Sequence, residues 1–414
     1  MQEENLLSLS YGNIIRKDLN ATDGLLPESF ETYQIVEAGN IVMRLTDLQN
    51  DKRSLRQGLV TERGIITSAY DALEVAPDND PRFWAYALLA LDLAKYYYSL
   101  GGGVRQSIKF ADFPNDWVQR PDRDTQRAIA DFLDRETARI DQLVAKKQRM
   151  AGLLGEKLDR TVRSYVSGEA DYPADEQRRA TGIGYLTTVP KHWSVEKIGW
   201  RYEIQLGKML DGAKQTGQNL RRYLRVADVQ WGKINTIDLP VMDFSASDRK
   251  RFRLLPGDLL VNEGGSYVGR SAVWRSTERE VYYQKALHRV RPRQSKRDTA
   301  DFLYYLMWFA TKYGVFIAGG NQTTIDHLTA EAFSRYRFAF PTLEEQFEIS
   351  ERLQSEEAKH TNISAKVNAS IASLREFRAA LITAAVTGQL DISGHARKGD
   401  TDRRLDAIEA EMRA

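Results

Sequence analysis

The stretch that decides the fold is Pro341–Asp391, PTLEEQFEISERLQSEEAKHTNISAKVNASIASLREFRAALITAAVTGQLD. It predicts one long helix, because a capping box from Thr342 to Glu345 follows a proline and Gly388 ends the run. An earlier stretch, Pro121–Asp171, repeats this punctuation without a gap at a constant offset of 220 residues. The matched pairs are Pro121 and Pro341, Gln126 and Gln346, Ile129 and Ile349, Leu133 and Leu353, Val166 and Val386, Gly168 and Gly388, and Asp171 and Asp391. Two copies of one helical element so far apart indicate a duplicated unit.

A mixed α/β domain is predicted on the N-terminal side of each long helix. LLPGDLLV at 254–261 matches IVEAGNIV at 35–42, and the helical pattern at 300–310 matches the one at 81–91. The predicted parts are a first domain at 1–120, a first helix at 121–171, a polar linker at 172–183, a second domain at 184–340, a second helix at 341–391, and a charged C-terminal tail at 392–414 with a short helix at Arg403–Met412. The segment 184–200 has no counterpart before the first domain, so we expect that domain to lack this opening segment.

The two long helices are expected to pack against each other. A helix of ~45 residues is about 65–70 Å long, and an amphipathic rod of that length must bury its apolar stripe on another helix. An intramolecular antiparallel coiled coil is the simplest solution. The predicted fold is therefore α+β, with two mixed α/β domains separated by the paired helices in a pseudo-twofold duplication. The predicted seam residues are Leu133, Ile140, Leu143, Met150, Leu154, Leu353, Ile363, Val367, Leu374 and Leu381, and His360 is interpreted as a polar seam residue rather than a ligand.

Composition argues against several classes of protein. Zero cysteines and five scattered histidines among 414 residues leave no basis for disulfides, zinc ribbons, Fe–S clusters or thiol catalysis, and we expect no metal site. No P-loop, dinucleotide fingerprint, zinc-protease motif or nucleophile elbow is present, so we expect no enzymatic activity. An enzyme with an active site outside the known motifs stays an alternative. The first residues, MQEENLLSLS, lack the regions of a signal peptide, and no apolar run approaches a membrane span, so a cytoplasmic location is expected.

Charge is distributed unevenly along the chain. Residues 184–342 hold 25 Lys and Arg against 15 Asp and Glu, whereas residues 1–121 hold 12 against 17. The second domain is therefore a candidate binder of a polyanion, and its cations stand beside aromatic and amide side chains. Lys and Arg neutralise phosphates, and Arg, Asn and Gln can read base edges in duplex DNA. A solvated charged face is the alternative interpretation of the same pattern.

Several phrases together resemble one protein family. The pattern F-x-x-P-x-x-x-E-Q-x-x-I stands at Phe338–Ile349, and L-I-x-x-A-V-T-G-x-L-D stands at Leu381–Asp391. The second domain adds PKHW at 190–193, LGKML at 206–210, PGDLLVNEGG at 256–265 and GRSAVW at 269–274, and the first domain adds LLSLSYGNI at 6–14 and RLTDLQNDKRS at 44–54. The chain resembles the specificity subunit of type I restriction–modification systems over nearly its whole length.

The resemblance implies a division of labour between subunits. Each α/β domain would be a target recognition domain that reads one half of a split, asymmetric DNA site. The paired helices would set the unread spacer and dock two methyltransferase subunits, which carry S-adenosylmethionine and methylate a flipped adenine. Restriction subunits would add ATP- and Mg²⁺-dependent cleavage. This chain would hold no cofactor itself and would determine the DNA sequence at which the complex acts. A coiled-coil scaffold or adaptor that does not read DNA is the competing interpretation.

Candidate DNA contacts follow from the same phrases and from the basic loops. Each of them has a structural loop residue as its alternative interpretation. In the first domain they are Ser10, Tyr11, Asn13, Arg44, Lys52, Arg53, Arg105, Gln106 and Lys109. In the second domain they are Lys208, Arg225, Trp231, Lys233, Arg270, Gln284, Lys285, Asn321, Gln322 and Thr323.

Overall fold

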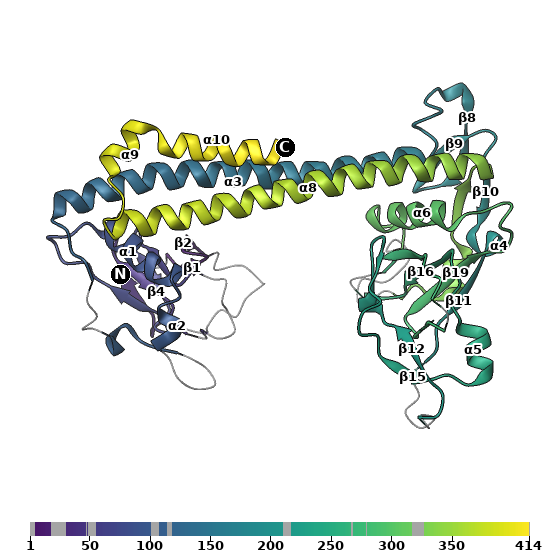
Figure 1. The fold of residues 1–414 in the computed structure, drawn as a ribbon, viewed down its shortest axis with the longest axis horizontal. Coiled ribbons are helices and arrows are strands. Elements are labelled where there is room, and N and C mark those ends of the chain that lie inside the picture. Colours follow the sequence, from purple (N-terminus) through teal and green to yellow (C-terminus); the bar gives the residue numbers. More distant parts are fainter. Residues whose placement is uncertain are drawn as a thin grey trace. The chain divides into compact units, whose positions relative to one another are not determined.

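A computed structural model describes residues 5–17, 30–46, 48, 55–100, 107–113, 118–209, 217–265, 268–278, 280–316 and 327–413 (Figure 1). The chain divides into two compact units. Unit 1 comprises Met1–Met150 with Ala365–Ala414, and unit 2 comprises Ala151–Ser364. Each long helix therefore contributes one part to each unit.

The N-terminal part of unit 1 contains short strands, two helices and a 3₁₀ turn among its described residues. Its elements are β1 (Leu7–Ser10), β2 (Asn13–Arg16), β3 (Gln34–Val36), β4 (Ile41–Met43), β5 (Gln57–Leu59), β6 (Gly64–Ile66), β7 (Asp71–Leu73), α1 (Pro81–Leu93), α2 (Tyr97–Leu100) and the 3₁₀ turn η1 (Phe110–Asp112). The strands pair as β5-β4-β7, β3-β6 and β1-β2. One face of β4 packs Ile41 and Met43 with Leu45 and Tyr97, and the other packs Val42 with Val36 and Leu7. This alternation is the period of a strand that is buried on both faces.

Unit 2 is built on the four-stranded antiparallel sheet β11-β19-β16-β17. Before and within this sheet lie η2 (Asp175–Gln177), β8 (Arg178–Ile183), β9 (Leu186–Pro190), β10 (Ser194–Lys197), α4 (Ile198–Arg201), β11 (Tyr202–Leu206), β12 (Leu220–Leu224), η4 (Val226–Asp228), β13 (Val229–Gln230) and β14 (Lys233–Ile234). After them follow β15 (Val241–Asp243), α5 (Ala246–Phe252), β16 (Asp258–Asn262), β17 (Ser271–Trp274), β18 (Tyr282–Tyr283), β19 (Leu287–Pro292), α6 (Ala300–Lys312), α7 (Ala330–Arg335) and β20 (Arg337–Phe340).

The two faces of this sheet bury separate cores. Leu259, Val261 and Val290 join the core that includes α6, and Leu260 and Leu287 join the core that includes β12 and β18. The sheet is therefore a central layer, and its strand ends and connecting loops are the parts left at the surface.

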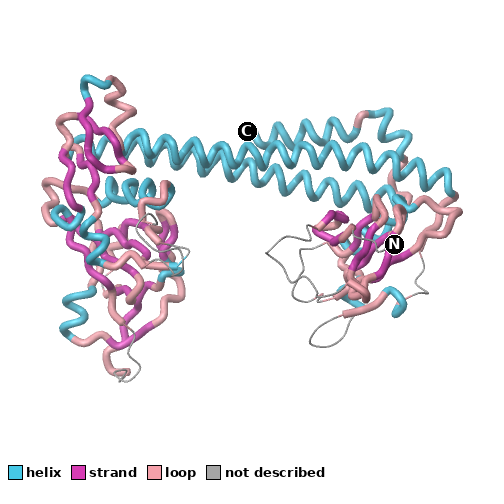
Figure 2. Tube along the Cα trace, turned by 180° about the vertical axis from the view of Figure 1, so that it is seen from behind, coloured by secondary structure: helices cyan, strands magenta, loops and turns pink. Residues whose placement is uncertain are grey.

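The long helices are α3 (Arg123–Val166) and α8 (Leu343–Val386), and both bounds differ by the same 220 residues that relate the sequences. In unit 1, Arg378 late in α8 pairs with Asp141 in the middle of α3 at 2.9 Å. In unit 2, Arg352 early in α8 pairs with Asp171 just beyond the end of α3 at 2.7 Å. The helices are therefore antiparallel, as both views show (Figures 1 and 2). The predicted fold class, two mixed α/β regions with paired long helices, is confirmed.

The register of the seam differs from the predicted one. Leu133, Ile140, Leu353, Val367, Leu374 and Leu381 are buried, and Leu154 is half-buried. Leu143 is half-buried like Leu154, whereas Met150 and Ile363 are each 39% exposed and do not fit the predicted seam. Buried companions lie four residues beyond five of the seam residues, at Thr137, Val144, Leu158, Ile371 and Ala385. Apolar side chains at 150 and 363 favoured the predicted register, because one buried companion, Thr137, is polar.

One buried glutamine repeats its hydrogen bonds in both copies. Gln126 accepts from the backbone N–H of Asp80 at 2.9 Å and donates to the carbonyl of Pro121. Gln346 accepts from the backbone N–H of Thr299 at 2.9 Å and donates to the carbonyl of Pro341. Asp80 and Thr299 are the N-caps of α1 and α6. Each glutamine therefore ties the start of a long helix to the start of its domain's main helix.

The C-terminal segment is more ordered than the charged tail that the sequence predicts. It forms α9 (Ile392–Lys398) and α10 (Asp400–Arg413), so the expected helix at Arg403–Met412 begins three residues earlier. Leu405 and Ile408 are buried, and Asp402 forms an ion pair with Arg139 of α3. In both views α10 lies beside α3 (Figures 1 and 2). The charge is therefore one face of a packed helix.

The segment 184–200 anchors the N-terminus of α8. β10 pairs with β20, and the Trp193 indole N–H donates to Glu345 Oε1 at 3.1 Å. The same carboxylate is 2.8 Å from His192 Nε2, and its other oxygen accepts from the Thr342 N–H at 2.9 Å. Burial acts to raise the pKa of Glu345, but these hydrogen bonds outweigh it and lower that pKa to about 2.

We expect Glu345→Gln to weaken unit 2 in a pH-dependent way. Because the folded pKa lies below the unfolded value of about 4.3, the carboxylate stabilises the fold above about pH 4, and this contribution is lost as the pH falls towards 2. The variant should lose about 1–2 kcal/mol of unfolding free energy at pH 7 and progressively less towards pH 3. Urea unfolding at several pH values measures this, with the exposed Glu344→Gln as the control. An equal deficit at pH 7 and pH 3 would contradict it.

Candidate nucleic-acid interface

Two predicted contacts, Tyr11 and Trp231, occupy the same place in the two copies. Their positions in the sequence differ by 220 residues. Each is the first turn residue of a hairpin with a two-residue turn, and each is followed by a glycine with a positive φ, Gly12 or Gly232. The β1–β2 hairpin packs on β5 in unit 1, and the β13–β14 hairpin packs on β17 in unit 2. The duplication therefore includes this hairpin. In the sequence it is indicated by an aromatic residue followed by glycine at the same offset, Tyr11-Gly12 and Trp231-Gly232.

The two hairpin aromatics have different environments. Trp231 is half-buried against Tyr304 and Trp308 of α6, at ring distances of 6.1 and 5.2 Å. Counted from the helix N-caps, Ala85 and Leu89 of α1 take the places of these two rings. Tyr11 is 72% exposed. Trp231 is therefore mainly a packing residue, and Tyr11 is free to stack on a partner.

The small residues of α1 leave a cleft in unit 1 beneath this hairpin. It has a volume of about 830 Å³, and its lining includes Tyr11, Asn13, Tyr86 and Arg378. The corresponding space in unit 2, between Gly232, α6 and α8, measures about 290 Å³. Tyr86 donates to Asp134 Oδ1 at 2.9 Å, and burial raises the pKa of Tyr86 to about 12, so the hydroxyl keeps its proton. Ser10 pairs with Asn13 across the turn.

Four other predicted residues of unit 2 converge from three loops. The backbones of Lys208 and Gln284 form an isolated parallel β-bridge, and the backbone N–H of Lys285 donates to the carbonyl of Lys208 at 2.6 Å. The backbone N–H of Gln284 donates to Leu224, next to Arg225. The close approach requires Gly207, since a Cβ there would lie 2.2 Å from the Gln284 carbonyl oxygen. These residues form one polar surface, which we call the β11–β19 loop surface (Lys208, Arg225, Gln284 and Lys285).

The cations of this surface differ in whether they form ion pairs within the protein. Lys208 Nζ donates to Asp248 Oδ2 at 2.7 Å, and Arg225 forms a two-point pair with Asp228 at 2.9 and 3.0 Å. Lys285 is exposed and, among the described residues, forms no ion pair. Lys285 is therefore the cation of this group that could reach a phosphate without first losing a partner.

The remaining predicted residues lie apart or outside the described residues. Arg270 donates to Gln230 Oε1 at 2.5 Å, beside the exposed Lys233. In unit 1, Arg44 is half-buried next to β4, and Lys109 is 3.5 Å from Asp71. The predictions outside the described residues are Lys52, Arg53, Arg105, Gln106, Asn321, Gln322 and Thr323.

Two further features were missed from the sequence. Lys250, Arg251 and Arg253, on α5 and just after it, are exposed, and the run RKRFR at 249–253 was their signal. Asn262 ends β16 with its side chain fully buried and neither amide atom hydrogen-bonded in the described part of the chain. Asn262 lies within the phrase PGDLLVNEGG, but the sequence alone does not show whether a side-chain amide is hydrogen-bonded.

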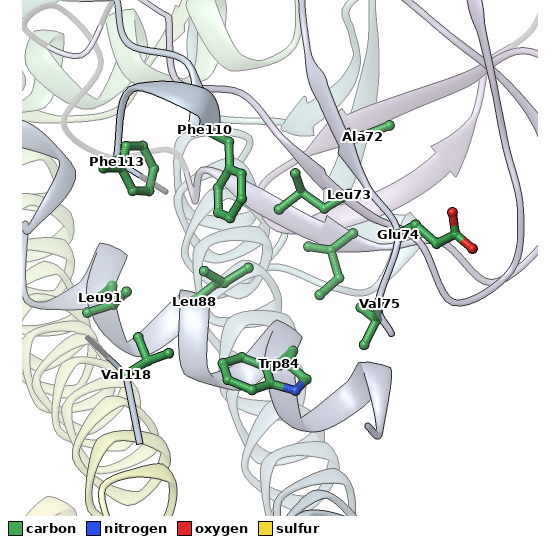
Figure 3. Close-up of a pocket in the computed structure, with 11 residues that line it drawn as sticks. Ala72, Leu73, Glu74, Val75, Trp84, Leu88, Leu91, Phe110, Phe113 and Val118 are labelled. Carbon is green, nitrogen blue, oxygen red and sulfur yellow. The ribbon is translucent and has the colours of Figure 1, made fainter. Parts of the chain in front are cut away.

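An apolar pocket of about 430 Å³ lies in unit 1 between β4, β7 and α1. Figure 3 shows Trp84, Leu88, Phe110 and Phe113 around it, with the Glu74 carboxylate directed away. Its chemistry suits an apolar group and not a phosphate. Among the described residues, no cluster of His, Asp and Glu could hold a metal ion, and no helix is long and apolar enough to cross a membrane.

Comparison with known proteins relates part of the sequence, and the fold, to known proteins. Residues 234–373 match the family model described as the type I restriction modification DNA specificity domain. A chain in a solved structure described as the structural basis of complex assembly and conformational transition of the type I R-M system shares 15% identity, with 88% of this chain and 85% of that chain covered and a TM-score of 0.62. The fold of this chain is therefore similar to the fold of that chain. The search of curated proteins found no significant match.

Two other solved structures were also matched. They are the HsdS subunit from Thermoanaerobacter tengcongensis, with 15% identity, 88% and 84% coverage and a TM-score of 0.44, and the S subunit of a type I system from M. genitalium, with 12% identity, 92% and 93% coverage and a TM-score of 0.38. The family match agrees with the resemblance that the sequence predicts over residues 234–373. The matched model is described as a DNA specificity domain, and the match is confined to residues 234–373.

Proposed function

We propose that this chain is the specificity subunit of a type I restriction–modification complex and that it recognises a bipartite, asymmetric DNA site. The observation that carries the proposal is the duplication. Each copy joins a hairpin-bearing α/β domain to a 44-residue helix through the same buried glutamine. Two related domains that differ in their exposed loops suit a site with two unlike halves, because loops can diverge while the scaffold stays constant.

The surface chemistry supports a role in DNA binding for unit 2. Its uncommitted cations, Lys285, Lys233 and the basic run of α5, could neutralise phosphates, while Arg270 and Gln284 could reach base edges. In unit 1 the exposed Tyr11 offers an aromatic face on which a base could stack. Contacts to phosphates would position the domains, and contacts to bases would select the sequence.

The partners and cofactors follow from the same proposal. The paired helices would set the distance between the half-sites and offer docking faces for two methyltransferase subunits. Those subunits would bind S-adenosylmethionine and flip the target adenine. Restriction subunits would use ATP and Mg²⁺, and the complex would act in the cytoplasm. None of this chemistry requires a cofactor in this chain.

A selection experiment tests this function. The purified chain, combined with its methyltransferase, is incubated with a random-sequence duplex library at near-physiological salt, and the bound molecules are sequenced. We expect two short fixed blocks separated by a gap of constant length. A scaffold or adaptor would give no enriched sequence, and a single continuous block would contradict the bipartite site.

Lys285→Ala is expected to weaken DNA binding without changing the preferred sequence. Removing one phosphate contact should reduce the slope of log affinity against log salt by about one. Fluorescence anisotropy with specific and unrelated duplexes at several salt concentrations measures it. Lys296→Ala, an exposed lysine in the loop between β19 and α6, is the matched control and should leave the slope unchanged. A loss confined to the specific duplex would instead assign Lys285 to base recognition.

A further inference from the structure

Among the described residues of the second recognition domain, Asn262 is a buried side chain with two polar atoms that both lack a hydrogen-bond partner. It is 0% exposed, and both its amide nitrogen and its amide oxygen lack hydrogen-bond partners in the described part of the chain. Leaving a buried polar group unsatisfied costs free energy, and native proteins contain few such groups. A leucine at this position would avoid the cost. The asparagine therefore calls for an explanation other than stability.

The position of Asn262 links it to the predicted contacts. It ends β16 opposite Leu287 of β19, and its backbone N–H donates to the carbonyl of Arg270 at 2.8 Å. Because side chains alternate along a strand, Asn262 shares a face with Leu260, which packs in the core away from α6. Leu287 in turn donates its N–H to Gln284. The unsatisfied amide thus lies where Arg270 meets the β11–β19 loop surface.

The backbone at the same point is also strained. Ala286 has a φ of +84°, a conformation that residues with a Cβ adopt only at a cost. It is held there because its carbonyl accepts from the Glu263 N–H at 3.0 Å, one residue beyond Asn262. Strained backbone and unsatisfied polar groups concentrate at binding sites, where a ligand supplies what the free protein lacks. Here the unsatisfied amide of Asn262 and the strained backbone of Ala286 lie together, next to the exposed Lys285.

From this coincidence we infer that Asn262 is a specificity-determining residue of the second recognition domain. Its amide is without partners in the described part of the free chain and gains them from the DNA half-site, through a base edge directly or through a water held against one. An amide offers one donor and one acceptor side by side, which is the complement of the adenine edge in the major groove. This inference rests on the proposed function and deepens it. Because Asn262 is fully buried, the surrounding loops must rearrange when DNA binds.

The test replaces Asn262 by leucine in the chain co-expressed with its methyltransferase. Methylated adenines are mapped genome-wide, and the thermal unfolding of the purified complex is measured. Asn262→Leu should reduce discrimination at one position of one half-site by about tenfold or more, with the other half-site and the gap unchanged. The unfolding temperature should stay the same or rise, because leucine suits the neighbouring Leu260 and Leu287.

Ser271→Ala is the matched control. Its hydroxyl is also fully buried and unsatisfied, but Ser271 pairs with Val261 and so faces the α6 side of the same sheet. Its motif should equal that of the wild type. A wild-type motif for Asn262→Leu would overturn the inference alone, as would a lost motif with a lowered unfolding temperature, which would indicate a structural role. A wild-type complex without a split motif would overturn the proposed function and the inference with it.

Discussion

Inserting one heptad after Lys147 and another after Val367 is expected to lengthen the gap between the two half-sites by about three base pairs. Seven helical residues add ~10.5 Å, and duplex DNA rises about 3.4 Å per base pair. The two insertion points are equivalent in the duplication, and a whole heptad preserves the seam on each side. Both half-sites should stay unchanged, because no recognition loop is altered. Sequencing the methylated sites of the variant measures the gap.

A single insertion provides the control for this pair. With a heptad after Lys147 alone, seven residues of α3 have no counterpart on α8, and the seam beyond them must break or slip. We expect methylation to fall sharply instead of moving to a longer gap. If the paired insertion left the gap at its wild-type length, the helices would not be the spacer.

Replacing Gln346 with leucine should lower the free energy of unfolding by about 3 kcal/mol. The change removes the bond to the Thr299 N–H and both donations, to Pro341 and to Arg297, leaving buried backbone groups without partners. The loss should appear in the unfolding of unit 2, because the bonds join α8 to the N-terminus of α6. Urea unfolding followed by tryptophan fluorescence measures it.

Gln354→Leu is the control for this substitution, since Gln354 is exposed on the same helix and its one bond, to Asp301, is 3.5 Å long. It should change the stability by less than about 0.5 kcal/mol. Gln126→Leu should destabilise unit 1 by a similar amount to Gln346→Leu, because its bonds are equivalent. Similar urea-unfolding curves for Gln346→Leu and Gln354→Leu would show that the hydrogen bonds of the buried glutamine do not stabilise unit 2.

The long helices could be predicted because their signals are local. Capping boxes, prolines and terminal glycines act within one turn, and their repetition at a fixed offset removed the remaining ambiguity. The seam register could not be predicted so well. Met150 and Ile363 are more apolar than the buried Thr137, but the partner helix decides which side is covered. In the charged C-terminal segment the sequence predicts a short helix at Arg403–Met412 but not the burial of Leu405 and Ile408, which depends on tertiary packing.

The interface was predicted only in part for the same reason. Lys208, Gln284 and Lys285 were chosen from separate phrases, and the fold brings them together through Gly207. Tyr11 and Trp231 looked alike as loop aromatics, but Ala85 and Tyr304 on the facing helices give them opposite environments. Asn262 could not be chosen at all, because its lack of hydrogen-bond partners exists only in three dimensions.

The central claim is that two recognition domains read two halves of one site while the paired helices hold the gap constant. Its most direct test is to co-express the chain with its cognate methyltransferase in a host without other adenine methylation and to map every methylated adenine. We predict a single motif of two short, different blocks separated by an unread gap of constant length. Random or absent methylation, or one uninterrupted block, would contradict the claim.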